Sequence, residues 1–165
     1  MKVAINQKPV PTIDVSYSSD IATALSYKDG IANTATLTNK STHIAAYDAV
    51  INNGTAAPAG TSSWFLPSIG QWNLIVQGLA TKKAGSPVTT DLGLNGGRSS
   101  NDNYKATNLN SVIEAAGGTG FRTDKQYWSS TQYSDWLVWN MKFDYGDIEE
   151  FVFHNISIAR SVLAF

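Results

Sequence analysis

The chain has 165 residues, of which 42% are hydrophobic and 15% charged, and its formal net charge is −1. This length fits a single domain over residues 1–165, and the apolar content with low charge excludes a disordered chain. A net charge near zero gives no electrostatic case for nucleic-acid binding. The absence of cysteine excludes disulfides, thiolate catalysis and zinc–thiolate or iron–sulfur sites.

The N-terminal residues 1–12 are expected to form an irregular or extended arm, because Pro9 and Pro11 exclude a helix there. They open with no apolar run of signal-peptide length, and no stretch of the chain is apolar and long enough to span a membrane. Residues 13–17 alternate apolar and polar side chains, which predicts a short strand.

The next segment, residues 19–38, is small and polar and carries a turn signal at Asp29-Gly30. A first helix is then predicted from a cap at Ser41 or Thr42 to about Asn53.

The second helix has the clearest local signal in the chain. Ser68 and Gln71 have the spacing of a capping box, in which each side chain bonds a free backbone N–H at the helix start. An apolar stripe at helical spacing follows, which predicts a buried face; it consists of Trp72, Ile75, Val76 and Leu79. Gly70 is expected to allow close packing at the start of this helix.

A long loop is predicted over residues 84–103, which are rich in Gly, Ser, Asn and Thr. A shorter third helical stripe follows, ended by Gly117-Gly118; it consists of Leu109, Val112, Ile113 and Ala116.

After Arg122 the spacing of the apolar residues changes from the helical pattern to the alternating pattern of β-strands. Four strands are predicted, with a hairpin turn at 145–147 between the second and third: Tyr127–Thr131, Leu137–Phe143, Asp147–His154 and Ala159–Phe165. The whole order predicts an α+β fold, with two principal helices packed on a mostly antiparallel, strand-rich C-terminal sheet.

Residues 127–165 contain regularly spaced aromatic residues that are expected to form the framework. Between them stand charged, amide and further aromatic residues whose order core packing does not explain. Trp128, Trp139 and Phe143 are expected in the core, whereas Glu149 and Glu150 stand beside Phe151. Phe151 and Phe153 share one strand face, which is either partly exposed to a ligand or buried. A mixture of aromatic, charged and amide groups is typical of a binding surface. The predicted ligand-binding residues are Asp135, Trp136, Asn140, Lys142, Asp144, Tyr145, Asp147, Glu149, Phe151, Phe153 and His154.

Catalytic and metal-binding patterns are absent from the sequence. His43 and His154 lack metal-ligand spacing, and the acids between 144 and 150 match no calcium loop. No hydrolase or phosphate-binding motif occurs, and adjacent Glu149 and Glu150 point to opposite faces of a strand. We therefore expect no catalytic residues, no metal, no cofactor and no enzymatic activity. A hydrolase using His154 and a purely structural subunit remain as alternatives.

Four segments resemble a known family. Residues 64–72 read WFLPSIGQW and residues 127–131 read YWSST, and both resemble motifs of bacterial C-type-lectin-like domains. Residues 29–34, DGIANT, also resemble a segment of that family. The ending resembles its W-x3-F-x2-G…R-x-V-x-A-F pattern, with Trp139, Phe143, Gly146, Arg160, Val162, Ala164 and Phe165.

Within that family the chain resembles the variable proteins of diversity-generating retroelements. This resemblance implies a lectin-type fold whose C-terminal surface residues are rewritten by a reverse transcriptase and displayed for recognition. The implied partner is a protein or glycan receptor, and the implied place is a phage tail or a bacterial cell surface. The motifs of calcium-dependent sugar binding are missing. A structural subunit of a phage tail or fimbria is the alternative, and the oligomeric state is left open.

Overall fold

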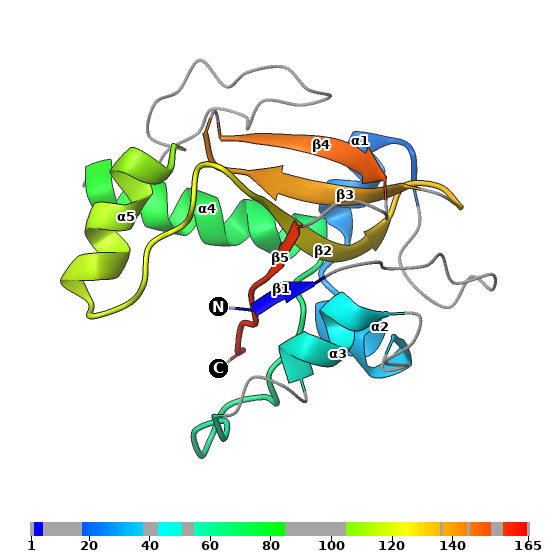
Figure 1. The fold of residues 1–165 in the computed structure, drawn as a ribbon, viewed down its shortest axis with the longest axis horizontal. Helices are drawn as coiled ribbons and strands as arrows, with labels where there is room; N and C mark the ends of the chain where they lie inside the picture. The colour runs from blue at the N-terminus through cyan, green and yellow to red at the C-terminus, as the bar shows by residue number, and fades with distance from the viewer. Residues whose placement is uncertain are drawn as a thin grey trace.

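The computed structural model describes residues 2–4, 18–37, 43–50, 55–84, 105–135, 137–144, 146–152 and 157–164 and has the predicted α+β architecture (Figure 1). Its helices are α1 (Ile21–Ser26), α2 (Gly30–Thr36), α3 (Ile44–Val50), α4 (Ile69–Ala84) and α5 (Ala106–Ala115). Its strands are β1 (Lys2–Ala4), β2 (Gln126–Gln132), β3 (Leu137–Lys142), β4 (Asp147–Val152) and β5 (Ser157–Ala159).

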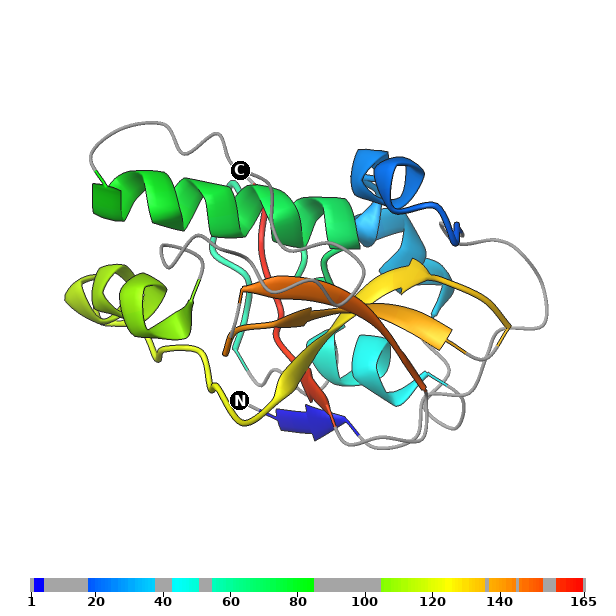
Figure 2. The same ribbon diagram turned by 90° about the horizontal axis from the view of Figure 1, so that it is seen from above.

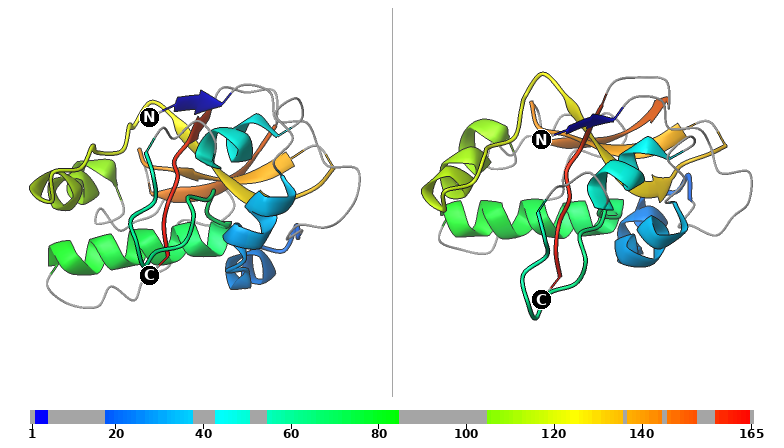
Figure 3. Two further views of the ribbon diagram at one scale, coloured as in Figure 1. Left: turned by 90° about the horizontal axis from the view of Figure 1, so that it is seen from below. Right: turned by 60° about the horizontal axis from the view of Figure 1, so that its bottom comes forward.

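The strands form one five-stranded sheet in the order β1-β5-β2-β3-β4. All neighbours pair antiparallel except β2 and β5, which run parallel. The pairing of β1 with β5 brings the first and last strands side by side (Figure 3). The mostly antiparallel, C-terminal sheet is therefore confirmed.

The sheet separates two groups of buried side chains, because neighbouring strand residues point to opposite faces. Tyr127 and Trp139 belong to the larger group, which packs against α4 and α5. Their neighbours Trp128 and Val138 belong to a smaller group, which includes the buried alanines of α3. In Figure 2, α4 runs along one side of the sheet and α3 lies on the other. Trp72, Trp128, Trp139 and Phe143 are fully buried, as the sequence predicts.

The start of α4 confirms the predicted capping box. The backbone N–H of Ser68 donates to Oε1 of Gln71 at 3.0 Å, and the N–H of Gln71 donates to the Ser68 hydroxyl at 3.3 Å. The stripe below is buried at Trp72 and Val76 and partly buried at Ile75 and Leu79. At Gly70 a β-carbon would collide with the carbonyl oxygens of Leu25 and Tyr27, so the close packing expected there is also confirmed.

Three of the four segments that carry the family resemblance meet at one junction. The N–H of Ser130 donates to the carbonyl of Pro67 at 2.9 Å, and the N–H of Ile69 donates to the Thr131 hydroxyl at 3.0 Å. The amide of Asn33 donates to the Ser130 carbonyl at 3.1 Å. Residues 29–34, 64–72 and 127–131 are thus joined through buried hydrogen bonds.

The helix count departs from the prediction. The described residues contain five helices, where the sequence predicted two principal helices and a shorter third one. Residues 19–38, expected to be a polar segment with a turn at Asp29-Gly30, form α1 and α2 with Gly30 as the first residue of α2. The physical reason is tertiary support: the Gly30 N–H donates to Gln71 of α4 at 3.1 Å, and Thr34 bonds to the backbone of Leu66.

Element boundaries also shift. Ala84, expected in the loop, ends α4. The last strand begins at Ser157 and ends at Ala159, and Val162 contributes only a single bridge to Phe65. The predicted hairpin between β3 and β4 is confirmed by their antiparallel pairing and by Gly146, whose φ of 69° is in the left-handed region. Several predictions lie outside the described residues: the strand over 13–17, the caps Ser41 and Thr42, the helix end at 51–53, the loop over 85–103, and Trp136, Tyr145, Phe153, His154 and Phe165.

A candidate binding face on strands β3 and β4

Strand register places the central residues of the predicted surface on one side of the sheet. Asn140 pairs with Glu149, Lys142 pairs with Asp147, and Val138 pairs with Phe151. Directly opposed residues share a face, and so do residues two apart on a strand. We call the side that carries Gln126, Asn140, Lys142, Asp147, Glu149 and Phe151 the polar face. Trp139, Met141 and Ile148 point the other way, into the larger core group.

An open hollow of about 310 Å³ lies on the polar face. Phe151 supplies an aromatic wall, and Lys142 and Asp144 come from the end of β3 and the turn that follows. The rest of the lining comes from a loop and the start of β2: Thr123, Asp124, Lys125 and Gln126. One aromatic ring among charged and amide groups is the composition of a recognition site.

Lys142 is the electrostatic centre of this hollow. Its ammonium lies 3.8 Å from a carboxylate oxygen of Asp144 and 3.7 Å from one of Glu149. The amide of Gln126 also donates to Glu149. All three charged side chains keep 21–29% of their surface exposed. Such pairs contribute only about 0–1 kcal/mol to stability, so these residues can change without unfolding the domain.

Asp147 is the acidic group on this face that lies out of solvent. It is 3% exposed, and its Oδ1 has no hydrogen-bond partner among the described residues. Burial, and after it the neighbouring charge of Glu149, raises the pKa of Asp147 to about 6, while Lys142 acts in the opposite direction. The carboxyl group is therefore held partly protonated near neutral pH.

Asn140 and Asp147 were expected among the exposed ligand-binding residues, and that expectation of exposure is wrong. Asn140 is fully buried, and both polar atoms of its side chain lack a hydrogen-bond partner among the described residues. The reason is position: β3 lies between β2 and β4, so the short amide sits between Trp128 on one side and Glu149 on the other. Neither residue can contact a ligand without movement of its neighbours.

The remaining predicted residues divide by location. Phe151 is partly exposed, which agrees with the ligand-face alternative for this strand. Asp135 is exposed but lies in the connection from β2 to β3, at the opposite end of β3 from Lys142 and the hollow. Trp136, Tyr145, Phe153 and His154 lie outside the described residues.

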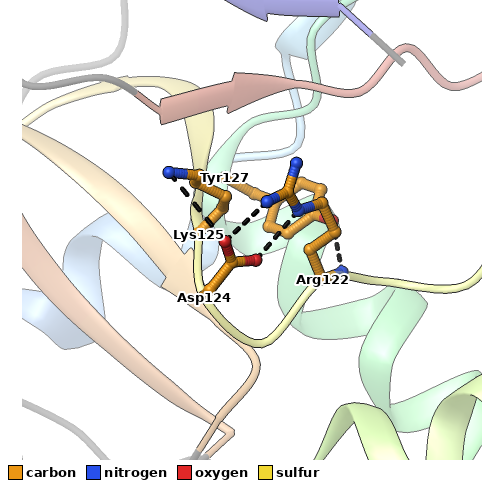
Figure 4. A network of polar contacts seen from close by, with 4 residues as sticks. All are labelled: Arg122, Asp124, Lys125 and Tyr127. Atoms are coloured by element: carbon orange, nitrogen blue, oxygen red, sulfur yellow. Dashed lines mark hydrogen bonds and ion pairs between the residues drawn. The ribbon is translucent and has the colours of Figure 1, made fainter.

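The sequence reasoning missed the loop that completes the hollow. Arg122 binds Asp124 through two nitrogens, at 2.8 and 2.5 Å, and Lys125 lies 4.0 Å from the same carboxylate (Figure 4). This contact raises the pKa of Arg122 and lowers that of Asp124. The backbone N–H of Arg122 also donates to the hydroxyl of buried Tyr127 at 2.8 Å, which holds the loop against β2. The available signal was the run of charges immediately before the YWSST strand.

The described part of the chain offers little that would form a metal site or a membrane-spanning segment. No group of three or more His, Cys, Asp or Glu side chains there is arranged to hold a metal ion. His43 is buried at the start of α3, and burial lowers its pKa. None of the described helices is both long enough and apolar enough to cross a membrane.

Comparison of the chain with known proteins found no match, whether among protein-family models, curated proteins or solved structures.

Proposed function

We propose that this protein is a recognition protein that binds its ligand through the polar face of β3 and β4. The observation that carries this proposal is the division made by the strand pleat. Lys142 and Phe151 line an open hollow, with Glu149 beside Lys142, whereas Met141, Phe143 and Ile148 point the other way and fill the core. A surface built this way can change its side chains while the framework stays constant.

The finer proposal is that the fold is C-type-lectin-like and that a retroelement diversifies this surface. Its support is the junction at which residues 29–34, 64–72 and 127–131 bond to one another. Segments that resemble one family in sequence are thus also neighbours in space. Under this proposal the partner is a protein or glycan receptor, and the protein acts on a phage tail or a bacterial surface without catalysing a reaction.

Paired display libraries test the binding face. One library randomises the face residues Lys142, Asp144, Glu149 and Phe151, and the matched library randomises four core residues of the same strands and turn: Trp139, Met141, Phe143 and Ile148. Both are selected for folding and then for binding to lysozyme and to streptavidin. We expect the face library to keep most members folded and to yield binders to each target.

The core library should lose most of its folded members, because each buried aromatic that is truncated costs about 3–5 kcal/mol. Equal loss of folding in the two libraries, or a folded face library without binders, would contradict the proposal. The retroelement component has a separate test. The gene should lie near a reverse transcriptase gene and an imperfect, adenine-rich copy of its own 3′ end.

A further inference from the structure

Strand β4 forms one outer edge of the sheet. It pairs with β3 through six consecutive positions, from Leu137 with Val152 to Lys142 with Asp147. Within the part of the chain that the structure describes, no other strand pairs with β4. In an antiparallel ladder, alternate residues of such an edge direct their N–H and C=O groups away from the sheet. These groups form a ready template for one more strand.

Three common protections of an edge strand are missing from β4, whose charges are all acidic. Edges are usually guarded by proline, by lysine or by a bulge that twists the strand away. The sequence of β4, DIEEFV, has no proline or basic residue, and its register with β3 is unbroken. By contrast, β2 in the interior of the sheet has a register shift between Trp128 and Gln132. Val152, at the end of β4, is 41% exposed.

The acids of β4 decide which kind of strand can pair with it. If two copies paired antiparallel about Glu149 or Glu150, that glutamate of one copy would lie directly opposite the same glutamate of the other, because opposed residues share a face of the sheet. Like charges directly opposite each other destabilise a strand pair. Glu150 is exposed, and no ion pair reaches it within the described residues. The edge therefore disfavours a second copy and is complementary to a basic strand.

We infer that the outer edge of β4 binds an extended, basic segment of a partner protein by strand addition. The backbone groups of β4 supply the hydrogen bonds, and Glu149 and Glu150 attract two consecutive basic residues, one on each side of the pleat. Apolar residues next to this basic pair lie against Phe151 and Val152. This inference rests on the proposed recognition function and deepens it by naming the class of partner.

The hollow on the polar face fits this geometry. Phe151 lines the hollow and also belongs to β4. A strand added along β4 places every second side chain on the polar face, beside Phe151. The added segment can therefore be read twice, by backbone pairing at the edge and by side-chain contacts at the hollow.

The test uses a fluorescent peptide of sequence TVVRKVT, measured by anisotropy against the full chain. Two further peptides carry backbone N-methyl groups, one peptide on the odd-numbered residues and the other on the even-numbered residues. Each therefore lacks the N–H groups along one edge of its strand and keeps those along the other. A fourth peptide replaces RK by EE. We expect the first peptide to bind, one N-methylated peptide to bind as well, the other to lose binding, and the acidic peptide to fail.

Two protein variants separate the edge from general electrostatics. Glu150→Lys should weaken binding of the basic peptide on the order of tenfold and allow the acidic peptide to bind, because attraction becomes repulsion. Glu114→Lys makes the same change on exposed α5 and should leave both affinities unaltered. Circular dichroism establishes that both variants are folded.

Three results would overturn the inference: no binding of the basic peptide, equal binding of the two N-methylated peptides, or equal effects of the two variants. An edge-paired homodimer that Glu150→Lys alters would overturn it too, because it would make the second copy the occupant. The outcome is independent of the display libraries. If the face library yields binders but the basic peptide does not bind, the edge inference is rejected and the recognition function of the polar face stands. If the peptide binds but the face library yields no binders, only the recognition function of the polar face is rejected.

Discussion

At the scale of single residues, Asp147 couples the candidate binding face to pH. Its folded-state pKa of about 6 lies above the ordinary value of 3.8, so the fold favours the protonated carboxyl. The stability contributed by this group is present in full below pH 3.8 and is lost as pH rises through about 6. Asp147→Asn should therefore raise the free energy of unfolding by roughly 1–3 kcal/mol at pH 7.5.

Urea unfolding at several pH values between 4 and 8 checks this prediction. The gain from Asp147→Asn should shrink toward zero as the pH approaches 4, where the wild-type carboxyl is protonated as well. Asp135→Asn, which changes an exposed carboxylate in a turn, is the matched control and should change the free energy of unfolding at pH 7.5 by no more than about 0.5 kcal/mol. A stability gain from Asp147→Asn that grows as the pH falls would show that the carboxylate is favoured in the fold.

Two asparagines with opposite surroundings give a second prediction at this scale. Asn140 is buried with neither amide atom bonded in the described structure, whereas Asn110 donates to the Phe121 carbonyl at 2.9 Å and accepts from its N–H at 2.6 Å. A buried polar group without a partner costs about 1–3 kcal/mol. Asn140→Leu should therefore stabilise the domain, and Asn110→Leu should destabilise it by a similar amount. Thermal unfolding of both variants measures the signs, and a destabilised Asn140→Leu would reveal a partner or a lack of space.

At the scale of elements, glycines in α4 make the packing of this helix testable. A β-carbon at Gly70 meets the carbonyl oxygens of Leu25 and Tyr27, whereas one at Gly78 meets nothing within 4 Å. Alanine is favoured over glycine in a helix by about 1 kcal/mol. Gly78→Ala should therefore stabilise the protein by up to that amount. Gly70→Ala should destabilise it by several times as much, because α1 and α4 must separate.

Unfolding in denaturant checks the pair, and the retained helical signal of Gly78→Ala serves as the control for Gly70→Ala. Similar stability of the two variants would mean that α1 does not contact α4 as closely as the structure has it.

Elements with strong local signals were predictable from the sequence. The capping box and apolar stripe of α4, the short stripe of α5 and the strand-like C-terminus each follow from side chains within one segment. Helices α1 and α2 were not predicted, because each spans only six or seven residues in a segment that is dominated by small side chains and carries a turn signal at Asp29-Gly30. Asn33 and Thr34 are held by bonds to Ser130 and Leu66, which are distant in sequence. Tertiary contacts of this kind leave no local pattern.

The whole molecule shows the same limit at the candidate site. Alternation along β3 and β4 was enough to predict that Lys142, Glu149 and Phe151 share a surface. It could not show that Asn140 and Asp147 on the same face are buried, because burial depends on which strands lie on either side. Residues 123–126 were missed for a related reason: they join the hollow only because β2 pairs with β3, not β4.

The last prediction concerns how tolerance to substitution is distributed over residues 127–164. Trp139 and Phe143 pack in the core with full burial, and cutting either to alanine should cost about 3–5 kcal/mol. That is a large part of the roughly 5–15 kcal/mol that stabilises a domain. Lys142, Asp144 and Glu149 should accept most residues, since changes at partly exposed positions usually stay within about 0.5 kcal/mol.

Phe151 is the decisive position in such a stability scan. Its ring lines the hollow and is partly exposed, so its truncation should cost clearly less than that of Trp139 while it abolishes ligand contact at the hollow. Ile148 on the same strand is fully buried on the opposite face and serves as the matched control. If Phe151→Ala proves as destabilising as Ile148→Ala, Phe151 belongs to the core, and the surface for recognition must be sought on another part of the molecule.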